Sequence, residues 1–597
     1  MSIDKRIAFY ASLSEHHKNL GEKYRKRLMI NSSLRLLAFV ALLSCPYFLR
    51  HSPALALAST GLSLVAFLFL VLRHNRLSKR RSRSETICRI AENEMRAFQF
   101  DFSCFDGAAE RINPAHDFSF DLDLFGEKSL FQQVNRTALL IGKESLINLF
   151  EHPMSKREGI ETRQQAVKEL TGKEDFCIEF RAIGAMADDT LPTKEEAEKL
   201  FRGVEKLSDA RFWKISATVV PFAYILLFAL SFFGMPGNVI VFFYLLTLAL
   251  SFVPMKQIGN LHRIFERKIK ILEAYSQLFG LIEDESFKSA DLNAIRRQVS
   301  LPEKASKAIA QIISHCRNLN QSFGFPIMLL LNPFLMWNVR FALKIGAWTQ
   351  KYRDETGKWF SALAKTDAMI SLATFAANHP DYAYPSFSEN FRFDGEQMGH
   401  PLIAKEKCVK NNIRIVSKPY FMIVTGANMA GKSTYLRTVG VNHLLASMGL
   451  PACAEKLEFY PGNLLTNLRT ADSLVNNESY FFAELKRLKM IIERLKSGED
   501  GLFIILDEIL KGTNSEDKQK GSFSLMKRLV ELGGNGIIAT HDLALGTLEE
   551  EFPGRIKNFH FDANISGDSL SFDYTLHEGI AQNMNASFLM RSMGIVE

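Results

Sequence analysis

The chain has 597 residues, enough for several domains, and its hydrophobic content of 47% with a mean hydropathy of −0.02 argues against a purely soluble protein. The formal net charge of +8 is small for this length, so charge alone does not indicate a nucleic-acid-binding protein, and anionic membrane lipid would suit it equally well. The seven cysteines are odd in number and form no C-x-x-C pair, which argues against a disulfide framework or a zinc site and indicates reduced thiols facing the cytosol.

Two uncharged stretches near the N-terminus predict a transmembrane hairpin. A polar and basic segment comes first, then 36–49 lacks charge over 14 residues and 54–72 lacks it over 19. As helices these stretches would reach roughly 21 and 28 Å, against a hydrocarbon core of about 30 Å. The second can span, whereas the first needs its flanking arginines to snorkel or the bilayer to thin. A cleaved signal peptide is the alternative, but its apolar run would start earlier and a second span would not follow at once.

A second pair of uncharged stretches, at 215–233 and 239–255, predicts another hairpin in mid-chain. They are 19 and 17 residues long and are joined by 234–238. Core helices of a large soluble domain are the alternative. Lysines and arginines lie on the outer flanks of both hairpins, and the short links carry almost none. By the positive-inside rule, the N-terminus, the middle and the C-terminal part face the cytoplasm in a multi-pass protein of the cell (inner) membrane.

A third apolar run lies at 323–337. Pro326, Asn332 and Pro333 interrupt it, and charged residues follow closely. We expect a buried helical segment there, with a re-entrant or fifth membrane segment as the alternative.

The remaining helical patterns connect these runs to the C-terminal part. Apolar residues at helical spacing predict one long helix over 260–282, leaving the membrane. A helix over 303–320 comes back after a polar turn at 286–301. From about residue 391, short β-branched runs alternate with helices, which is typical of an α/β nucleotide-binding domain.

A glycine-rich loop dictates a chemistry by its residue types and their spacing. Residues 426–433 fit G-x-x-x-x-G-K-[ST], with a buried strand predicted before them at 421–424 and a helix after them at 435–448. A chance glycine turn is the alternative. Backbone N–H groups and the helix N-terminus can face a triphosphate, Lys432 can neutralise its β and γ oxygens, and the Ser433 hydroxyl can hold Mg²⁺. The predicted ATP-binding residues are Gly426, Ala427, Asn428, Met429, Ala430, Gly431, Lys432, Ser433 and Thr434.

Two further apolar strands end in residues suited to hydrolysis. The strand at 502–506 runs into Asp507 and Glu508. Asp507 can reach Mg²⁺ through water, and Glu508 can orient and deprotonate the attacking water. The strand at 536–540 runs into His541, which can hydrogen-bond a γ-phosphate or the lytic water. A simple surface histidine is the alternative.

These residues carry a resemblance to a known family. The segments 425–437, 506–513 and 539–542 resemble the ATPase domain of the DNA mismatch repair protein MutS family. Segments at 399–402 and 579–586 resemble the opening and closing parts of that domain. Further resemblance to the family's helical core and lever helices begins near Leu122, and the whole covers roughly 122–207 and 323–595.

The resemblance implies an ABC-type ATPase that uses ATP and Mg²⁺ and completes its sites by homodimerisation. In such dimers, a signature loop of one subunit contacts the γ-phosphate bound by the other. The matching segment is 476–479, before a predicted helix at 480–496, so Ser479 would bind ATP in trans. A simple helix N-cap at Ser479 is a compatible alternative.

Other features depart from the family's mismatch readers. Those carry an N-terminal domain with a Phe-x-Glu wedge, whereas a membrane hairpin occupies that end here. The letters of Phe125, Gly126 and Glu127 fit the wedge, but they lie in the core-start segment and we interpret them as chance. The turn at 286–301 is too short for the family's DNA clamp. The resemblance therefore implies a membrane-anchored MutS-like ATPase that lacks the mismatch-recognition domain.

Three functions follow as hypotheses. The first is a membrane-anchored ATPase whose dimer closes on ATP binding and reopens on hydrolysis, moving lever helices at 260–282 and 303–344, the hairpins and an unknown protein partner. The second is a DNA-binding ATPase of the mismatch-repair type acting at the membrane. The third is an ABC-type transporter, and the absence of ionisable residues from the predicted spans argues against it.

The predicted fold class is multidomain, α + α/β, with two transmembrane helical hairpins, a helical MutS-like core and lever region, and a C-terminal P-loop ABC-type α/β ATPase. The predicted divisions are an N-terminal cytoplasmic segment at 1–30, hairpin 1 at 31–75, a basic helical linker at 76–117, the first part of the core at 118–210, hairpin 2 at 211–256, lever helices and second part of the core at 257–390, and the ATPase domain at 391–597.

Overall fold

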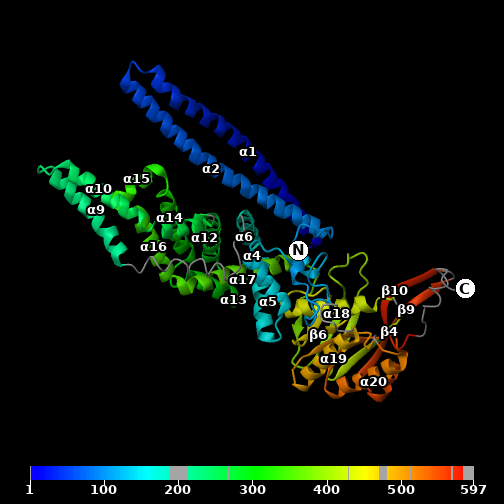
Figure 1. Ribbon diagram of the computed structural model, residues 1–597. Coiled ribbons are helices and arrows are strands. Elements are labelled where there is room, and N and C mark those ends of the chain that lie inside the picture. Colours follow the sequence, from blue (N-terminus) through cyan, green and yellow to red (C-terminus); the bar gives the residue numbers. More distant parts are fainter. Residues whose placement is uncertain are drawn as a thin grey trace.

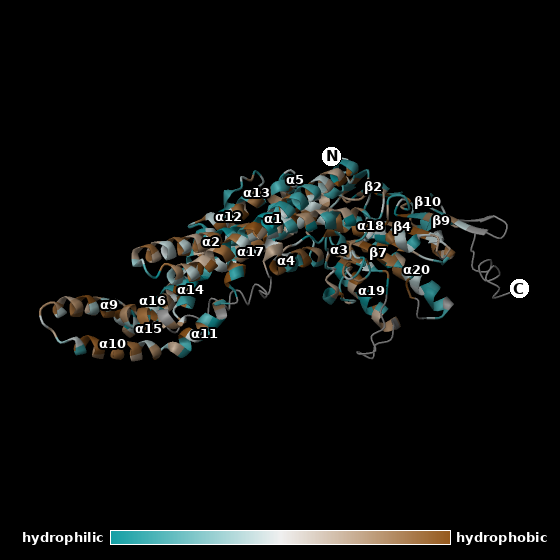
Figure 2. Cartoon of the chain, turned by 90° about the horizontal axis from the view of Figure 1, so that it is seen from above, coloured by the Kyte–Doolittle hydropathy of each residue, from teal (hydrophilic) through white to brown (hydrophobic). Residues whose placement is uncertain are grey.

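The computed structural model describes residues 2–187, 211–266, 268–427, 429–469, 480–510, 513–566 and 569–581. A C-terminal α/β domain lies at one end of an elongated molecule, and a helical core joins it to two helical hairpins (Figure 1). Both hairpins extend away from the C-terminal domain on the same side of the molecule (Figure 1). The helices α9 and α10 of the second hairpin are largely hydrophobic (Figure 2).

The first hairpin consists of α1 (Ile3–Phe48) and α2 (Pro53–Phe98), each 46 residues long. Such helices are about 69 Å long, so each extends well beyond one apolar stretch. Leu37, Leu57 and Leu62, in the outer half, are more than half exposed. No proline or glycine interrupts α2 after Gly61. The helix therefore continues through residue 76, where the basic linker was expected to begin.

The second hairpin consists of α9 (Arg211–Ser231) and α10 (Gly237–Phe252). Three described helices, α1, α2 and α9, are long and apolar enough to cross a membrane, and α10 with α11 (Met255–Glu266) makes a fourth if this pair, bent by 53°, is one span. The described residues thus support the prediction of apolar membrane-crossing helices.

The expected long helix over 260–282 is wrong. The chain instead forms α11 and, after a break, α12 (Ile269–Asp284). The buried stripe of Ile258, Leu261 and Phe265 meets Lys268 at its next helical position, so the stripe cannot continue there without burying an ammonium group.

The polar turn expected at 286–301 is also wrong, because it contains α13 (Ala290–Ser300). Leu292, Ile295 and Val299 are buried at helical spacing, which places an amphipathic helix against α17 (Arg353–Asn378). The polar residues that suggested a turn form the other face of this helix. The other helices of this region are α3 (Leu130–Val134), α4 (Leu140–Glu151), α5 (Arg157–Thr171), α6 (Glu174–Met186), α14 (Ala305–Gln321), α15 (Phe325–Leu335) and α16 (Trp337–Lys351).

A buried ionic cluster attaches the first hairpin to this core. Glu94 of α2 is fully buried and accepts hydrogen bonds from Arg136 at 2.8 Å, Arg181 at 2.6 Å and Asn378 at 3.0 Å. Burial alone would raise the pKa of Glu94, but the two arginines outweigh it and hold the pKa below its ordinary value. The foot of the hairpin is therefore tied to the core and to the end of α17.

The C-terminal domain is built on a six-stranded sheet of order β10-β9-β4-β8-β7-β6, in which only β10 is antiparallel to its neighbour. Its strands are β4 (Tyr420–Gly426), β6 (Leu464–Asn467), β7 (Phe503–Asp507), β8 (Asn535–Ala539), β9 (Ile556–Ser566) and β10 (Ser569–Glu578). A smaller sheet of order β1-β5-β2-β3 lies beside it, with β1 (Ser386–Phe387), β2 (Phe393–Met398), β3 (Asn411–Ile415) and β5 (Lys456–Phe459).

Helices cover both faces of the larger sheet. Alternate strand residues such as Val424 and Ile505 pack in the same hydrophobic core as α18 (Lys432–Ser447). Their neighbours, such as Ile423 and Ile504, pack with α19 (Tyr480–Lys496) and α20 (Ser515–Glu531) on the other face. This alternation, with helices on both faces of a mostly parallel sheet, matches the α/β architecture expected from the sequence.

Candidate active site

Three parallel strands end together at one edge of the larger sheet. β4 pairs with β8, and β8 pairs with β7, in a register that sets Val424 and Asp507 each opposite Ala539. The pairing continues one residue beyond the strands, since Thr540 N–H donates to the Val424 carbonyl at 3.0 Å and Glu508 N–H to the Ala539 carbonyl at 2.9 Å. Because parallel strands present their carboxyl ends at one edge, the glycine-rich loop, the two carboxylates and the histidine come together there.

The glycine-rich loop wraps around the Lys432 side chain. Gly426 and Gly431 have φ angles of 143° and 107°, which favour glycine, and α18 begins directly after the loop at Lys432. The ammonium group of Lys432 donates to the Gly426 carbonyl at 2.7 Å and the Ala427 carbonyl at 2.8 Å. Burial lowers the pKa of this lysine from 10.5 to about 8, against the opposing pull of Asp507 and Glu508.

Ser433 and Asp507 form a pair of oxygen donors beside the lysine. The Ser433 hydroxyl, in the first turn of α18, donates to Asp507 Oδ2 at 2.7 Å. Hydroxyl and carboxylate oxygens are ligands that Mg²⁺ accepts, and Mg²⁺ at phosphate sites takes one or two protein groups together with substrate phosphates. The Ser433–Asp507 pair therefore suits a metal shared with a substrate.

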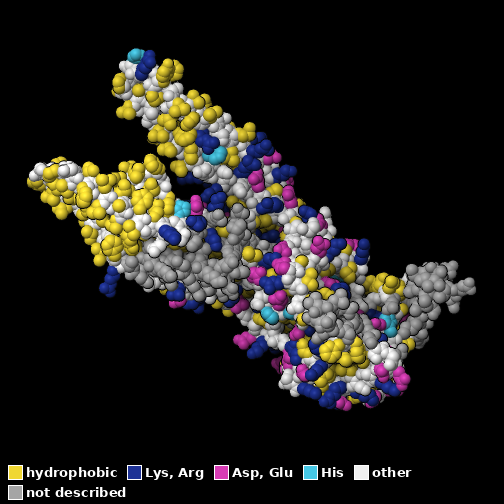
Figure 3. Space-filling view, in the orientation of Figure 1, with side chains coloured by type: hydrophobic (Ala, Val, Ile, Leu, Met, Phe, Trp, Pro, Cys, Tyr) yellow, Lys and Arg dark blue, Asp and Glu magenta, His cyan; other side chains and the backbone are white. Residues whose placement is uncertain are grey.

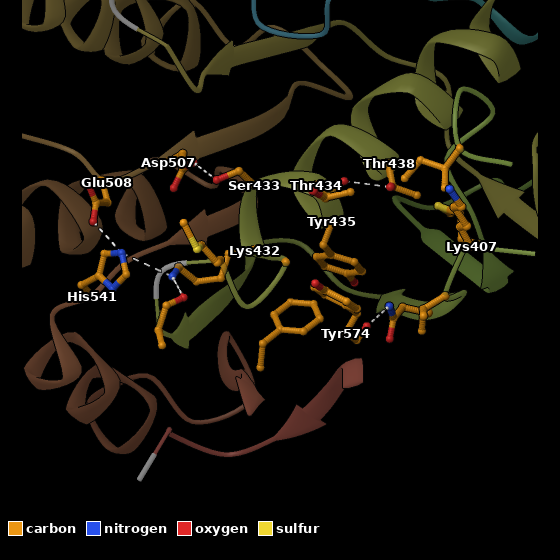
Figure 4. Close-up of a pocket in the computed structure, with 18 residues that line it drawn as sticks. Lys407, Lys432, Ser433, Thr434, Tyr435, Thr438, Asp507, Glu508, His541 and Tyr574 are labelled. Atoms are coloured by element: carbon orange, nitrogen blue, oxygen red, sulfur yellow. Dashed lines mark hydrogen bonds and ion pairs between the residues drawn. The ribbon is translucent and has the colours of Figure 1, made fainter. Parts of the chain in front are cut away.

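Glu508 and His541 face each other across the ends of β7 and β8. Their Oε1 and Nε2 atoms are 2.9 Å apart, and His541 Nε2 is 3.3 Å from Lys432 Nζ (Figure 4). Glu508 has a φ of 47°, which turns the carboxylate out of the strand direction. The histidine therefore lies between the carboxylate and the lysine, with one ring nitrogen within reach of both.

These side chains line a cavity of about 630 Å³. One end is polar and holds Lys432, Ser433, Asp507, Glu508 and His541. The other end is walled by side chains from β2 and the loop after it and from β9 and β10. They are Met398, Ile403, Lys407, Val409, Phe561 and Tyr574.

The apolar wall was not found from the sequence. Tyr574 lies beside the glycine-rich loop, since a Cβ built on Gly431 would be 3.1 Å from its ring. Asn411 fixes this part of β10 by donating to the Tyr574 carbonyl at 2.9 Å. Tyr574 and the loop after β2 are both separated from the glycine-rich loop in the sequence. They approach it only through tertiary contacts. The one available signal was the family-like segment at 399–402, which leads into this wall.

The cavity suits a magnesium-bound nucleoside triphosphate. The Lys432 ammonium now bonds backbone carbonyls of its own loop, which leaves a buried cation able to turn toward phosphate oxygens. A Cβ on Gly426 would lie 2.7 Å from the Phe561 carbonyl, so the loop needs glycine to fit against β9. The aromatic wall offers a stacking surface for a planar base.

Some predicted site residues lie outside the described part of the chain. Asn428 of the loop and Ser479, predicted to act in trans, are among them. The described neighbours Ala427, Met429, Ala430 and Thr434 belong to the loop and the start of α18, and all but Ala430 line the cavity. Of the predicted site, the structure thus brings together both loop ends, both carboxylates and the histidine.

Comparison with known proteins agrees with this architecture. Residues 422–592 match the family model of MutS domain V. The DNA mismatch repair proteins MutS of Thermotoga sp. (strain RQ2) and Persephonella marina are 29% and 30% identical over 250 and 249 residues, which is 41% of this chain and 31% and 28% of theirs. Human MutS protein homolog 4 is 28% identical over 238 residues, 38% of this chain and 25% of its own length.

The chain therefore covers less than a third of the length of these relatives. The likeness lies in its C-terminal part, where the parallel sheet, the glycine-rich loop and the candidate site are found. The C-terminal part of the chain, residues 422–592, is thus similar to domain V of the MutS family.

Proposed function

We propose that the chain is a membrane-anchored ATPase of the MutS family. ATP binding closes a homodimer of the C-terminal domains, hydrolysis reopens it, and the helical core carries the change to the hairpins. The observation that supports this most is the gathering of Lys432, Ser433, Asp507, Glu508 and His541 at one edge of a parallel sheet. That set contains a phosphate-binding cation, oxygen ligands for Mg²⁺ and a base, which are the parts that phosphoryl transfer requires.

Each residue has a role in this proposal. Lys432 leaves its two backbone carbonyls and neutralises the β and γ oxygens. Ser433 and Asp507 would hold Mg²⁺, Asp507 through water, and the ion would withdraw charge from the phosphates. Glu508 takes a proton from the attacking water. His541, whose Nε2 lies 2.9 Å from Glu508 Oε1, orients that water and senses the γ-phosphate. The residues 427–431 and Thr434 cradle the phosphates with backbone N–H groups.

Two further parts of the proposal concern the contacts between subunits of the dimer and the location of the chain in the membrane. Ser479, just before α19, would complete the γ-phosphate contacts of the partner subunit. The apolar helices α1, α2, α9 and α10 would cross the inner membrane and leave the C-terminal domain in the cytoplasm, consistent with the basic residues on their inner flanks.

The test is ATP hydrolysis by the full-length chain in lipid nanodiscs. Glu508→Gln keeps the shape of the side chain but removes the base, so we expect phosphate release to fall by about 10²–10⁴-fold while ATP binding is retained. Glu549→Gln, a carboxylate of α21 (Leu548–Glu551) outside the cavity, is the matched control. Unchanged phosphate release in the Glu508 variant would refute the assignment.

Duplex DNA is a second candidate partner, favoured by the relatives whose names are DNA mismatch repair protein MutS. It would be bound by the core without mismatch choice. Each phosphate contact adds about 0.9 to the slope of log K against log salt, so a titration at several salt concentrations measures it. Absence of binding at low salt would remove this candidate.

A further inference from the structure

The short helix α15 has an apolar surface that the core does not bury. It belongs to an uncharged run of 22 residues, 318–339, between Arg317 and Arg340. Phe325 is 73% exposed and Leu330 is 61% exposed, so the expectation of a buried segment is wrong for this face. We infer that α15 is a re-entrant membrane segment whose outer face contacts lipid acyl chains. This inference rests on the proposed anchoring of the hairpins in a bilayer.

The inner face of α15 is locked onto the second hairpin. The Phe334 ring lies 4.6 Å from Tyr224 of α9 and 5.6 Å from Tyr244 of α10, measured between ring centroids. The Tyr244 hydroxyl donates to the Leu329 carbonyl at 3.0 Å, and Tyr224 shares a hydrogen bond of 2.7 Å with Thr247. The polar atoms of these tyrosines are thus satisfied between helices, as they must be within a bilayer. The three helices form one unit that enters the membrane together.

The outer face continues the apolar surface of that hairpin. Leu226 of α9 and Phe242 of α10 are 59% and 69% exposed, comparable with Phe325 and Leu330. On the face seen in Figure 3, hydrophobic side chains gather over α9, α10 and α15. An apolar surface this extensive is unusual for a soluble protein and is typical of a lipid-facing one. Since the hairpin is embedded, the adjoining face of α15 lies at the same depth.

The length of α15 makes it enter and leave on the same side. Its 11 residues reach about 16 Å, roughly half of the hydrocarbon core. The chain turns back at Met336, which has a φ of 48°. Asn338 N–H donates to the Asn332 side chain at 3.1 Å, and the Asn338 amide donates to the Ser251 carbonyl at 3.0 Å. These bonds satisfy polar groups where α15 ends, beside Trp337 at the base of the unit.

Residues typical of the membrane interface mark the base of this unit. Trp337 follows α15 and donates from its ring nitrogen to the Asn318 carbonyl at 2.9 Å, while Trp213 lies at the start of α9. Arg340 donates to the Ala217 carbonyl at 3.3 Å, near that same end of α9. Tryptophan and arginine prefer the headgroup level, so the boundary passes near these residues. A soluble protein partner or a second copy would not require this arrangement.

The helices that precede and follow α15 connect it to the rest of the core. The helix α14 leads into it, and α16 leads out of it into α17, which ends at Asn378 in the buried cluster with Glu94. A rotation of α16 and α17 produced at the C-terminal domain would therefore move α15 together with the second hairpin within the bilayer.

The test is photocrosslinking of the full-length chain in vesicles of equal parts phosphatidylcholine and phosphatidylglycerol. Benzoylphenylalanine is placed at Phe325 or Leu330, both of which point outward and accommodate a larger side chain. Phe334 is the inward control on the same helix, and Val416, an exposed apolar residue of the C-terminal domain, is the aqueous control. Leu226 serves as the hairpin control. Adducts are identified by mass spectrometry of the digested protein.

We expect phospholipid adducts at Phe325 and Leu330, as at Leu226. We expect no lipid adducts at Phe334 and Val416. Lipid adducts at Leu226 without any at Phe325 and Leu330 would overturn the re-entrant segment while leaving the anchoring intact. Protein cross-links at the two α15 positions, to a second copy or another chain, would also overturn it. Absence of lipid adducts at Leu226 would instead refute the proposed membrane anchoring itself.

Discussion

The buried lysine of the candidate site makes the stability of the nucleotide-free protein change with pH in the alkaline range. Lys432 has a pKa of about 8 in the folded chain, because burial penalises its charge, against 10.5 when unfolded. The charged form thus costs stability below about pH 8, and this cost disappears as the folded lysine loses its proton while the unfolded one keeps it. Stability contributed by this group therefore rises with pH, from about 8 toward 10.5.

The magnitude follows from the two pKa values. Between about pH 7 and about pH 9.5, the folded chain gains about 2 kcal/mol relative to the unfolded chain from this lysine alone. For a domain of roughly 200 residues, that corresponds to about 4–8 °C in Tm. Other groups titrate in the same range, so the quantity to measure is the difference in Tm between the wild type and Lys432→Met at each pH.

The assay is thermal unfolding of the nucleotide-free full-length chain in nanodiscs. We expect the Tm of the wild type to rise relative to the Tm of Lys432→Met as pH rises. Lys496→Met removes an exposed lysine of α19, so its Tm should differ from that of the wild type by a constant amount at every pH. With MgATP present the rise should shrink, because phosphate oxygens favour the charged lysine. A difference between wild type and Lys432→Met that is flat with pH would refute the burial argument.

Three further predictions test the packing and the cavity. Glu94→Ala leaves two buried arginines without their carboxylate and should lower the free energy of unfolding by about 3–5 kcal/mol, measured as a lower urea midpoint. Gly142→Ala places a Cβ 1.9 Å from an Asp367 carboxylate oxygen that caps α4, so it should cost about 1–3 kcal/mol, whereas Gly280→Ala, with its nearest contact at 3.9 Å, should cost nothing; equal Tm values for the two would contradict this. Tyr574→Ala should weaken ATP binding by about 1 kcal/mol, roughly fivefold in Kd, in a fluorescent-nucleotide titration, and an unchanged Kd would exclude Tyr574 from the base site.

The polar end of the candidate site was predictable because it depends on local pattern. Asp507, Glu508 and His541 lie at or just after the ends of hydrophobic strands, and Ser433 follows the glycine-rich loop that begins at the end of another. Parallel strands must present such residues at one edge. Thus Ser433, Asp507, Glu508 and His541 lie in one cavity, as the motifs indicated. Their chemical roles stay predictions. The apolar end was not predictable, because Val409 comes from the loop after β2, Tyr574 comes from β10, and neither carries a motif of its own.

The helical part shows the same limit. The apolar runs identified both hairpins, since length and absence of charge are local properties. Where a helix breaks or which face it buries depends on its neighbours, so the break at Lys268, the helix over Ala290–Ser300 and the exposed face of α15 were missed. In each case a pattern of polar and apolar residues fitted two arrangements, and packing decided between them.

The most direct test of the central claim is whether ATP closes a dimer through this site. The measurement is the mass of Glu508→Gln protein in detergent micelles, determined by mass photometry with and without MgATP, beside a Glu508→Gln, Lys432→Met double variant. We predict that MgATP shifts the Glu508→Gln protein from monomer to dimer and leaves the double variant unchanged, because the latter lacks the phosphate-binding cation. A mass that does not respond to MgATP, or an equal response in both proteins, would contradict the account.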